Sequence, residues 1–295
     1  MRGRRLTRRR GKRAIVVGGT SGIGEGIALR FAKARVAVTI IGRSAERGNE
    51  VLERLKQACN DVEHRFVPLD CSLVSNALQF AKEERETYSS LDFLVLTVGM
   101  VATSFHPTKE GIDSKLAVHY FSRVAFMQGL APLLEKGEDP RVISVLSGGI
   151  HGPYHGYETN FALSEASYGV KDSADAPGMY NDIAMEKLAG EHPSLAFFHA
   201  SPGFISTNWG SEFPWYLKGP VRLMQRFGRS TKDCGELLCV PLFDSQWKAT
   251  AGQRNWHIVD QYGAITERVT GIHDQAKDSV WSQTTQLLQP FTPSA

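Results

Sequence analysis

The stretch AIVVGGTSGIGEGIALRFAKA, residues 14–34, decides the fold class of this 295-residue chain. It opens with a short apolar run rich in β-branched residues, which predicts a buried strand. Gly18, Gly22 and Gly24 follow directly, and apolar residues then recur at the spacing of a helix that packs on a sheet. In this strand–turn–helix context the glycines let the backbone approach a pyrophosphate, and the helix N-terminus offers it unpaired N–H groups. We therefore predict a dinucleotide site, the alternative being glycines that serve only a tight turn.

The rest of the chain alternates strand-like and helix-like segments in the same way. Apolar runs predict six further strands, at 36–42, 64–70, 91–99, 141–147, 195–203 and 256–260. Helix-like segments lie at 46–58, 72–86, 115–135 and 180–190. Such alternation is typical of an α/β fold with helices on both faces of a parallel sheet. We expect a doubly wound, Rossmann-type sheet of about seven strands, in one domain over residues 14–295.

The first thirteen residues, MRGRRLTRRRGKR, form a basic arm with eight Arg or Lys residues and no acid. The formal net charge of the chain is +3, so residues 14–295 carry 3 − 8 = −5. We expect a disordered arm; a nucleic-acid, membrane-surface or targeting segment is the alternative. Because the body is net acidic, the charge pattern argues against nucleic acid as a partner.

Composition places the chain among ordinary globular proteins, with 42% hydrophobic and 22% charged residues. No apolar run approaches the ~18 residues of a membrane-spanning helix. The four cysteines show no metal-ligand spacing, so we expect reduced thiols, no metal, and a cytoplasmic protein, with an organellar or nuclear address left open by the arm. A homo-oligomer is compatible with the sequence.

The spacing G-x-x-x-G-I-G in residues 18–24 resembles the short-chain dehydrogenase/reductase family, and the likeness runs from Ala14 to about Leu288. It implies that Ser147, at the end of the fifth strand, holds the substrate carbonyl. PGFIST, residues 202–207, matches P-G-x-x-x-T, whose threonine meets the nicotinamide carboxamide. The cofactor-binding residues implied in this way are Gly18, Thr20, Ser21, Gly22, Ile23, Gly24, Arg43, Asp70 (at the adenine ring), Gly99, Pro202, Gly203 and Thr207.

Three features make the chain most similar to retinol-dehydrogenase-like enzymes and to reductases of fungal secondary metabolism. These are the region of His151, the long insert after Ser147, and the C-terminal helix that contains Trp281.

The end of the second strand, IIGRS, favours NADP over NAD. An acid at this place holds the ribose 2′-hydroxyl in the dinucleotide fold, and a nearby arginine accommodates a 2′-phosphate. Here Gly42 stands where the acid would be and Arg43 follows. A guanidinium can bind a phosphate with two hydrogen bonds. The alternative is a solvated arginine on the surface.

Two positions depart from the family pattern before the catalytic stretch. The fourth strand ends LTVG, residues 96–99, where the family has N-N-A-G; Thr97 can still make one hydrogen bond. Aligning Pro132 with the family's proline puts His119 where an asparagine supports a proton-relay water. Histidine can donate and accept, so a relay through His119 is one interpretation, and a packed histidine is the other.

The third departure is the stretch SYGVKDSADAPGMYND, residues 167–182, because no Y-x-x-x-K follows Ser147. The family's tyrosine donates the proton, and a lysine four residues later lowers its pKa from about 10. Tyr168 has Lys171 three residues on, which is the same face of a helix. Counting back from the helix end puts the family pair at Ala174 and Gly178, so Tyr168 is about six residues early. We expect Tyr168 with Lys171 to be the proton donor if the insert folds back.

Aromatic and apolar residues crowd the segment NWGSEFPWYLKGPVRLMQRFGR, residues 208–229. We expect a lid over a hydrophobic substrate, the alternatives being core packing or a basic amphipathic surface. The sequence thus predicts an NADP-dependent oxidoreductase for a hydrophobic ketone or alcohol, with Ser147, Tyr168, Lys171 and His119 as catalytic candidates. The competing hypothesis is a dinucleotide-binding protein without redox chemistry, acting as a binding, scaffold or non-redox catalytic module.

Overall fold

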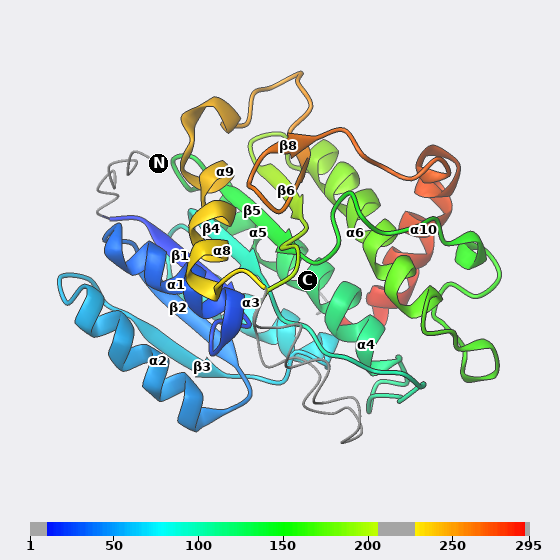
Figure 1. Ribbon diagram of the computed structural model, residues 1–295, viewed down its shortest axis with the longest axis horizontal. Helices are drawn as coiled ribbons and strands as arrows, with labels where there is room; N and C mark the ends of the chain where they lie inside the picture. The colour runs from blue at the N-terminus through cyan, green and yellow to red at the C-terminus, as the bar shows by residue number, and fades with distance from the viewer. Residues whose placement is uncertain (1–10, 206–227, 293–295) are drawn as a thin grey trace.

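A single sheet of eight strands crosses the protein in the order β3-β2-β1-β4-β5-β6-β7-β8 (Figure 1). This computed structural model describes residues 11–205 and 228–292. The strands are β1 (Arg13–Val17), β2 (Ala37–Gly42), β3 (Arg65–Pro68), β4 (Phe93–Leu96), β5 (Arg141–Val145), β6 (Ala196–Ala200), β7 (Trp256–Val259) and β8 (Ile265–Thr266). The first seven are parallel, as predicted, and the two-residue β8 is an antiparallel addition at the edge.

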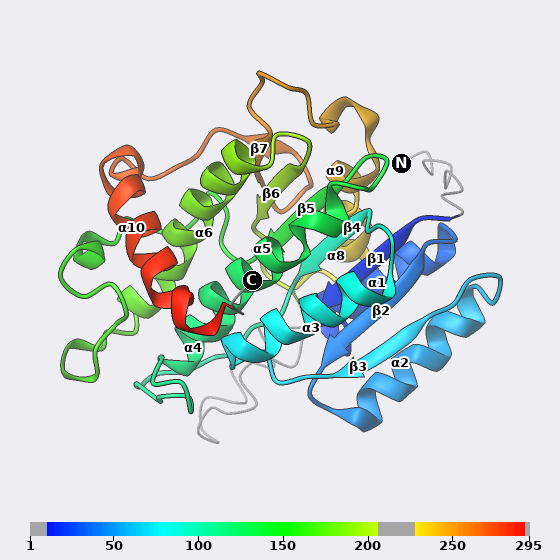
Figure 2. The same ribbon diagram turned by 180° about the vertical axis from the view of Figure 1, so that it is seen from behind.

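Helices cover both faces of the sheet (Figures 1 and 2). One layer contains α1 (Gly22–Lys33), α2 (Ala45–Ala58), α8 (Thr231–Leu238) and α9 (Val240–Phe243). The other contains α3 (Val74–Thr87), α4 (Ser114–Leu116), the π-helical turn Ala117–Phe121, α5 (Ser122–Leu134), α6 (Asp172–Glu191) and α10 (His273–Leu288). Side chains of β1 alternate between the two layers, since Ile15 packs in one core and Val16 in the other. The Rossmann-type fold is therefore confirmed.

Helix α6 is longer than the sequence predicts. It begins at Asp172 and continues through Pro177 and Gly178, whereas the sequence predicted a helix only over residues 180–190. A proline inside a helix loses a backbone hydrogen bond and costs about 3 kcal/mol. The helix persists because its middle is enclosed on nearly every side, with thirteen of its twenty residues buried. Tyr168 therefore precedes the helix, after a 3₁₀ turn at Glu165–Ser167.

The folded body begins before residue 14. Lys12 pairs with Asp92 at 3.2 Å, and the guanidinium of Arg13, the first residue of β1, lies 3.0 Å from the ring centre of Tyr88. The predicted arm of residues 1–13 is thus too long by at least these two residues, because both cations find partners on the body. Residues 1–10 lie outside the described part of the chain.

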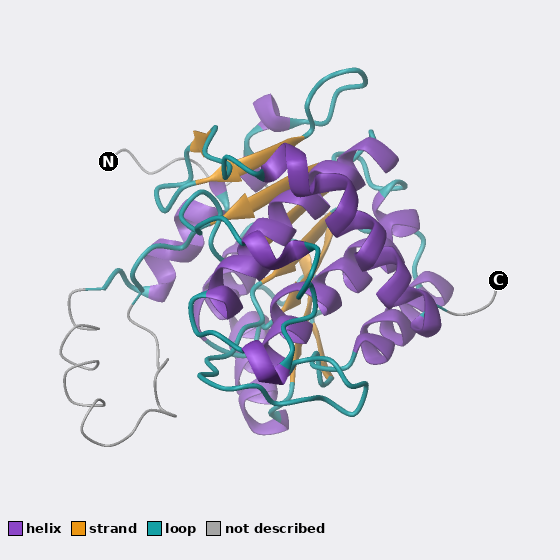
Figure 3. Cartoon of the chain, turned by 90° about the vertical axis from the view of Figure 1, so that its right-hand side faces the viewer, coloured by secondary structure: helices purple, strands orange, loops and turns teal. Residues whose placement is uncertain are grey.

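The strand order reverses between β1 and β4, which are neighbours in the middle of the sheet. Crossovers leave this point in opposite directions, so the carboxyl ends of β1 and β4 open a crevice where ligands bind in such folds. Figure 3 shows the strands with helices around them. None of the described helices is long and apolar enough to cross a membrane.

Candidate active site

The glycine loop after β1 packs tightly against the end of β4. Gly18 and Gly22 have φ angles of +85° and +60°, which side-chain-bearing residues rarely adopt. A Cβ atom at Gly18 would lie 2.6 Å from the backbone nitrogen of Val98. Thr97 donates its hydroxyl to the carbonyl of Val17 at 2.9 Å, so it ties β4 to the loop. The loop leads directly into α1, whose first N–H groups have no partner within the helix, and this arrangement fits a pyrophosphate.

The end of β2 fits the other half of a dinucleotide. A Cβ atom at Gly42 would lie 2.5 Å from the hydroxyl of Thr20, so the strand end and the glycine loop touch. Arg43 is exposed, and within the described ranges no acid lies in ion-pair distance of it. The carboxylate of Asp70 accepts a hydrogen bond from the Ser72 N–H at 2.9 Å. The geometry thus leaves the guanidinium of Arg43 available to a phosphate.

Three strand ends meet at the predicted substrate end. Gly99 follows β4, Ser147 follows β5, and Pro202 and Gly203 follow β6. The Oγ atom of Ser147 is buried and has no hydrogen-bond partner in the described part of the chain, so no tyrosine hydroxyl is bonded to it. Thr207 and the predicted lid lie in residues 206–227, outside the described residues.

Beneath Ser147 lies a buried cluster that the sequence analysis did not predict. Asp182 of α6 bridges two histidines: its Oδ1 lies 2.5 Å from Nδ1 of His199 in β6, and its Oδ2 lies 2.7 Å from Nε2 of His151. The backbone N–H of Ser147 donates to Nε2 of His199 at 3.3 Å. A signal for this cluster is present in the sequence, because His199 in FFHAS and Asp182 in MYNDIAM lie within otherwise apolar segments.

The partners of each ring nitrogen decide the charges in this cluster. Nδ1 of His151 faces the carbonyl of Gly152 at 3.1 Å and Nε2 faces Asp182, so both ring nitrogens face acceptors, an arrangement that favours an imidazolium. His199 accepts at Nε2 and donates at Nδ1, so it is neutral. Burial lowers the pKa of His151, but Asp182 and the Gly152 carbonyl outweigh it and raise that pKa above its ordinary value. For His199 burial prevails and its pKa is lowered, in agreement with this count.

The carboxylate between the two rings is ionised. Burial alone would raise the pKa of Asp182, but His199 and His151 outweigh burial and hold it below its usual range. A metal ion does not fit these tautomers. To bind a metal ion, Nδ1 of His199 would have to lose its hydrogen, and the proton of the neutral ring would then be on Nε2. There it would meet the N–H of Ser147, which donates to Nε2 in this structure. The cluster is a hydrogen-bonded ion pair with a neutral histidine attached.

His119 contacts the backbone that follows β4. Its Nε2 accepts a hydrogen bond from the Met100 N–H at 3.0 Å. Burial, with the charge of Arg123, holds the pKa of His119 well below its usual value, so the ring is neutral with its proton on Nδ1. It sits in the π-helical turn, a feature often found at functional sites. The Asn181 side chain donates to the His119 carbonyl at 2.9 Å.

A second buried network holds these elements together. Arg123 is enclosed and donates to the carbonyl of Val98 at 2.5 Å and to the hydroxyl of Ser144 at 2.6 Å. Ser144 in turn donates to Asn181 at 2.8 Å. Burial lowers the pKa of Arg123 to about 9. This network links the ends of β4 and β5 to α6, and its members are far apart in sequence.

Tyr168 and Lys171 are not brought together. The ammonium of Lys171 pairs with Asp175 at 2.5 Å, and its side chain is 77% exposed. The predicted same-face spacing fails because α6 begins only at Asp172. The Tyr168 hydroxyl is buried without a hydrogen-bond partner in the described residues, and its ring packs edge-on against Phe105.

A different lysine, Lys115 of α4, shares a neighbour with Tyr168. Its ammonium is buried and donates to the hydroxyl of Ser173 at 2.9 Å. Burial lowers the pKa of Lys115. Burial raises the pKa of Tyr168, and the neighbouring Ser173 hydroxyl opposes this in part, although no hydrogen bond joins the two. Ser173 is thus a common neighbour of Lys115 and Tyr168, a contact that sequence spacing could not show.

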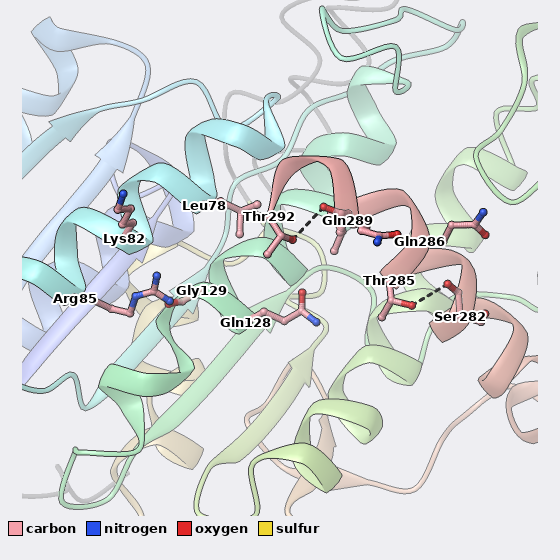
Figure 4. A pocket seen from close by; sticks show the side chains of 11 residues that line it. Leu78, Lys82, Arg85, Gln128, Gly129, Ser282, Thr285, Gln286, Gln289 and Thr292 are labelled. Carbon is pink, nitrogen blue, oxygen red and sulfur yellow. Dashed lines mark hydrogen bonds between the residues drawn. The ribbon is translucent and has the colours of Figure 1, made fainter. Parts of the chain in front are cut away.

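A pocket on the described surface lies away from this site. It measures about 930 Å³ and runs between α3, α5 and α10 (Figure 4). Lys82, Arg85, Gln128 and Ser282 are among its polar lining residues, and none of the predicted site residues borders it.

Comparisons with known proteins agree with this geometry. A family model described as short chain dehydrogenase matches residues 12–159. An oxidoreductase of Emericella nidulans is 30% identical over 275 residues, which are 88% of this chain and 79% of the relative. An oxidoreductase of Emericella variicolor is 33% identical over 216 residues, which are 72% of this chain and 61% of that relative. Both relatives are fungal.

Among solved structures, a short chain dehydrogenase of Burkholderia cenocepacia in complex with NADP has a TM-score of 0.62. It is 20% identical, and the match covers 87% of this chain and 99% of that chain. At this identity the likeness demonstrates a shared fold.

Proposed function

Because the chain belongs to the short-chain dehydrogenase family and is an oxidoreductase, we propose that it transfers hydride between NADP(H) and a hydrophobic ketone or alcohol. The observation that carries this proposal is the buried Oγ atom of Ser147, which has no hydrogen-bond partner in the described chain. A buried hydroxyl without a partner costs about 1–3 kcal/mol. A substrate oxygen bound at the end of β5 would accept its hydrogen bond.

Arg43 supports NADP as the cofactor. Its guanidinium follows β2, where the ribose of a bound dinucleotide would lie, and it is exposed without an acidic partner in the described residues. The positive-φ glycine loop and the start of α1 would hold the pyrophosphate. The adenine and nicotinamide ends of the cofactor would be bordered by Asp70, Gly99, Pro202 and Gly203. Thr207 is proposed as a cofactor-binding residue by resemblance alone.

Exposed apolar side chains in loops of the described chain support a hydrophobic substrate. Val101, Ile150 and Val170 are 39%, 66% and 57% exposed. They lie in the loops that follow β4 and β5 and in the segment that precedes α6. Large apolar side chains at the mouth of a site would lose their contact with water when an apolar substrate binds.

The bound cofactor would supply or accept the hydride at the substrate carbon. In the direction of reduction, Ser147 donates a hydrogen bond to the carbonyl oxygen and Tyr168 donates the proton that completes the alcohol. We assign the proton to Tyr168 because its hydroxyl is also buried without a partner in the described chain. Lys115, which donates to Ser173, a neighbour of Tyr168, would replace Lys171 as the cation that assists the tyrosine.

The test is a titration with NADPH and with NADH, followed by turnover of ketones and aldehydes of increasing apolar size. We expect tighter binding of NADPH and a rise of kcat/KM with apolar size. Ser147→Ala should reduce kcat/KM and retain NADPH binding, whereas Ser282→Ala, in the distant pocket, should change neither. Binding of NADPH without turnover of any carbonyl would favour the non-redox hypothesis.

A further inference from the structure

The side chains of Ser147 and His151 both lie against α6 at Gly178. A Cβ atom at Gly178 would lie 2.5 Å from Oγ of Ser147 and 2.7 Å from Cγ of His151. The backbone N–H of His151 also donates to the Ser147 carbonyl at 3.2 Å, so one turn carries both residues. The imidazole therefore lies next to the hydroxyl that would hold the substrate oxygen.

Gly178 is the position to which the helix count assigned the family's lysine. No side chain fits there, because Ser147 and His151 already occupy its space. A positive charge on this side of the site must therefore come from a residue other than a lysine at position 178.

We propose that His151, held as an imidazolium by Asp182, is the positive end of a fixed ion pair, and that it stabilises the negative charge developing on the substrate oxygen at Ser147. This inference rests on the proposed reduction of a carbonyl. His151 does not touch the substrate, since its side chain is 1% exposed and both ring nitrogens are bonded within the protein. It acts through the field at the oxygen, where a preorganised charge in a site closed to water is most effective.

The groups that face His151 set the pH range of this effect. From α6 come Asp182 and Asp175, and Asp175 also accepts the N–H of Gly152 at 2.8 Å. From β6 comes the neutral His199, which shares Asp182. The balance favours the charged ring, and the pKa of His151 is raised. The rate of reduction should therefore fall only as pH rises through that raised pKa.

The first test needs no turnover. In protein labelled with ¹⁵N-histidine and free of cofactor, His151→Gln identifies the resonances of His151. We expect both ring nitrogens of His151 to be protonated at neutral pH, while His199 shows a single proton on Nδ1. A neutral His151 at neutral pH would overturn the proposal, whether or not the enzyme is active.

The second test uses the pH profile of kcat for carbonyl reduction. Asp182→Asn removes the carboxylate, so the alkaline limb of the profile and the NMR titration of His151 should both move to lower pH. The matched control is Glu186→Gln, one helical turn further along α6, which alters the similar pair of Glu186 with His273 (2.6 Å). The control should leave the limb in place, and both variants should bind NADPH as the unmodified protein does.

His151→Gln covers the case in which Asp182→Asn does not fold. It should lower kcat roughly 10- to 100-fold at neutral pH, somewhat less than loss of a direct oxyanion donor, and abolish the alkaline limb. An alkaline limb that neither variant changes would overturn the assignment of His151 and leave the proposed function standing. Absence of turnover in the unmodified protein would instead contradict the proposed function.

Discussion

The hydroxyl oxygen of Ser147 lies 2.5 Å from the point that a Cβ atom would occupy at Gly178 of α6. The serine and the helix are therefore in contact only because residue 178 has no side chain. Any larger residue must displace the serine, the helix or His151.

Gly178→Ala should accordingly impair both activity and stability. An inserted methyl group in a packed interior typically costs about 1–3 kcal/mol, and here it also moves the hydroxyl that holds the substrate. We expect kcat/KM to fall at least roughly tenfold, and the midpoint of thermal unfolding to fall as well. Gly190→Ala is the control on the same helix, because its Cβ would meet nothing within 4 Å. It should retain activity and gain up to about 1 kcal/mol; full activity of Gly178→Ala would contradict the placement of Ser147.

Arg43→Asp should reverse the preference between the two cofactors. The change removes a guanidinium and places a carboxylate where a 2′-phosphate would lie. A charged hydrogen bond contributes about 1.5–3 kcal/mol, so NADPH should bind roughly 10- to 100-fold more weakly while NADH changes little. Lys136→Asp makes the same charge change beyond the end of α5, and neither Kd should change. Equal affinities of the unmodified protein for NADPH and NADH would refute the assignment.

Tyr168→Phe tests the proton donor. Loss of a general acid lowers the rate by about 10²–10⁴-fold, and cofactor binding should be retained. Lys171→Met is the control, and it should change kcat little because that ammonium is exposed and bonded to Asp175. If Tyr168→Phe is fully active and Ser147→Ala is not, the proton comes from another group, and His119 is the next candidate.

Lys115→Met should be more harmful than Lys171→Met. It removes the buried ammonium that donates to Ser173, the residue that Lys115 and Tyr168 share as a neighbour. We expect a lower kcat and an optimum for reduction at a changed pH, measured with the two lysine variants side by side. Equal activity of the two variants would show that Lys115 does not assist the proton donor.

Acid should destabilise the protein from about pH 6.5 downward. Burial lowers the pKa of His64, His119, His199 and His257, the last to about 4. Below about pH 6.5, which is the ordinary pKa of histidine, these histidines bind protons in the unfolded chain but not in the folded chain. The free energy of unfolding therefore falls as pH falls. His151 has the opposite sign, because its raised pKa gives stability that is lost only as pH rises through that value.

Urea unfolding at about pH 7.5 and about pH 5 measures this loss. His257→Gln should reduce it, since one of the four lowered groups is then absent. His155→Gln, at an exposed position, should leave the loss unchanged. A free energy of unfolding that is the same at both pH values would contradict the prediction.

The sequence by itself determined the sheet, the glycine loop and the strand ends. These features follow from local rules: β-branched runs form strands, and glycines at 18, 22 and 24 between a strand and a helix suit a pyrophosphate. Ser147 and Arg43 were predicted as site residues for the same reason, because each directly follows a predicted strand and parallel strands end at one edge. The pairing of Tyr168 with Lys171 was predicted from a helical spacing and failed, because α6 begins only at Asp172.

Only the tertiary structure decided which groups meet at that edge. His151, Asp182 and His199 come from a turn, a helix and a strand, and the bonded pairs are 31 and 17 positions apart in the sequence. Lys115 reaches Ser173 across 58 residues. A buried charge is stable only beside an opposite charge or a hydrogen-bond partner, and the chain supplies those partners by packing distant elements together. Their identity therefore depends on the folded arrangement of α6 against β5 and β6, which local sequence patterns do not specify.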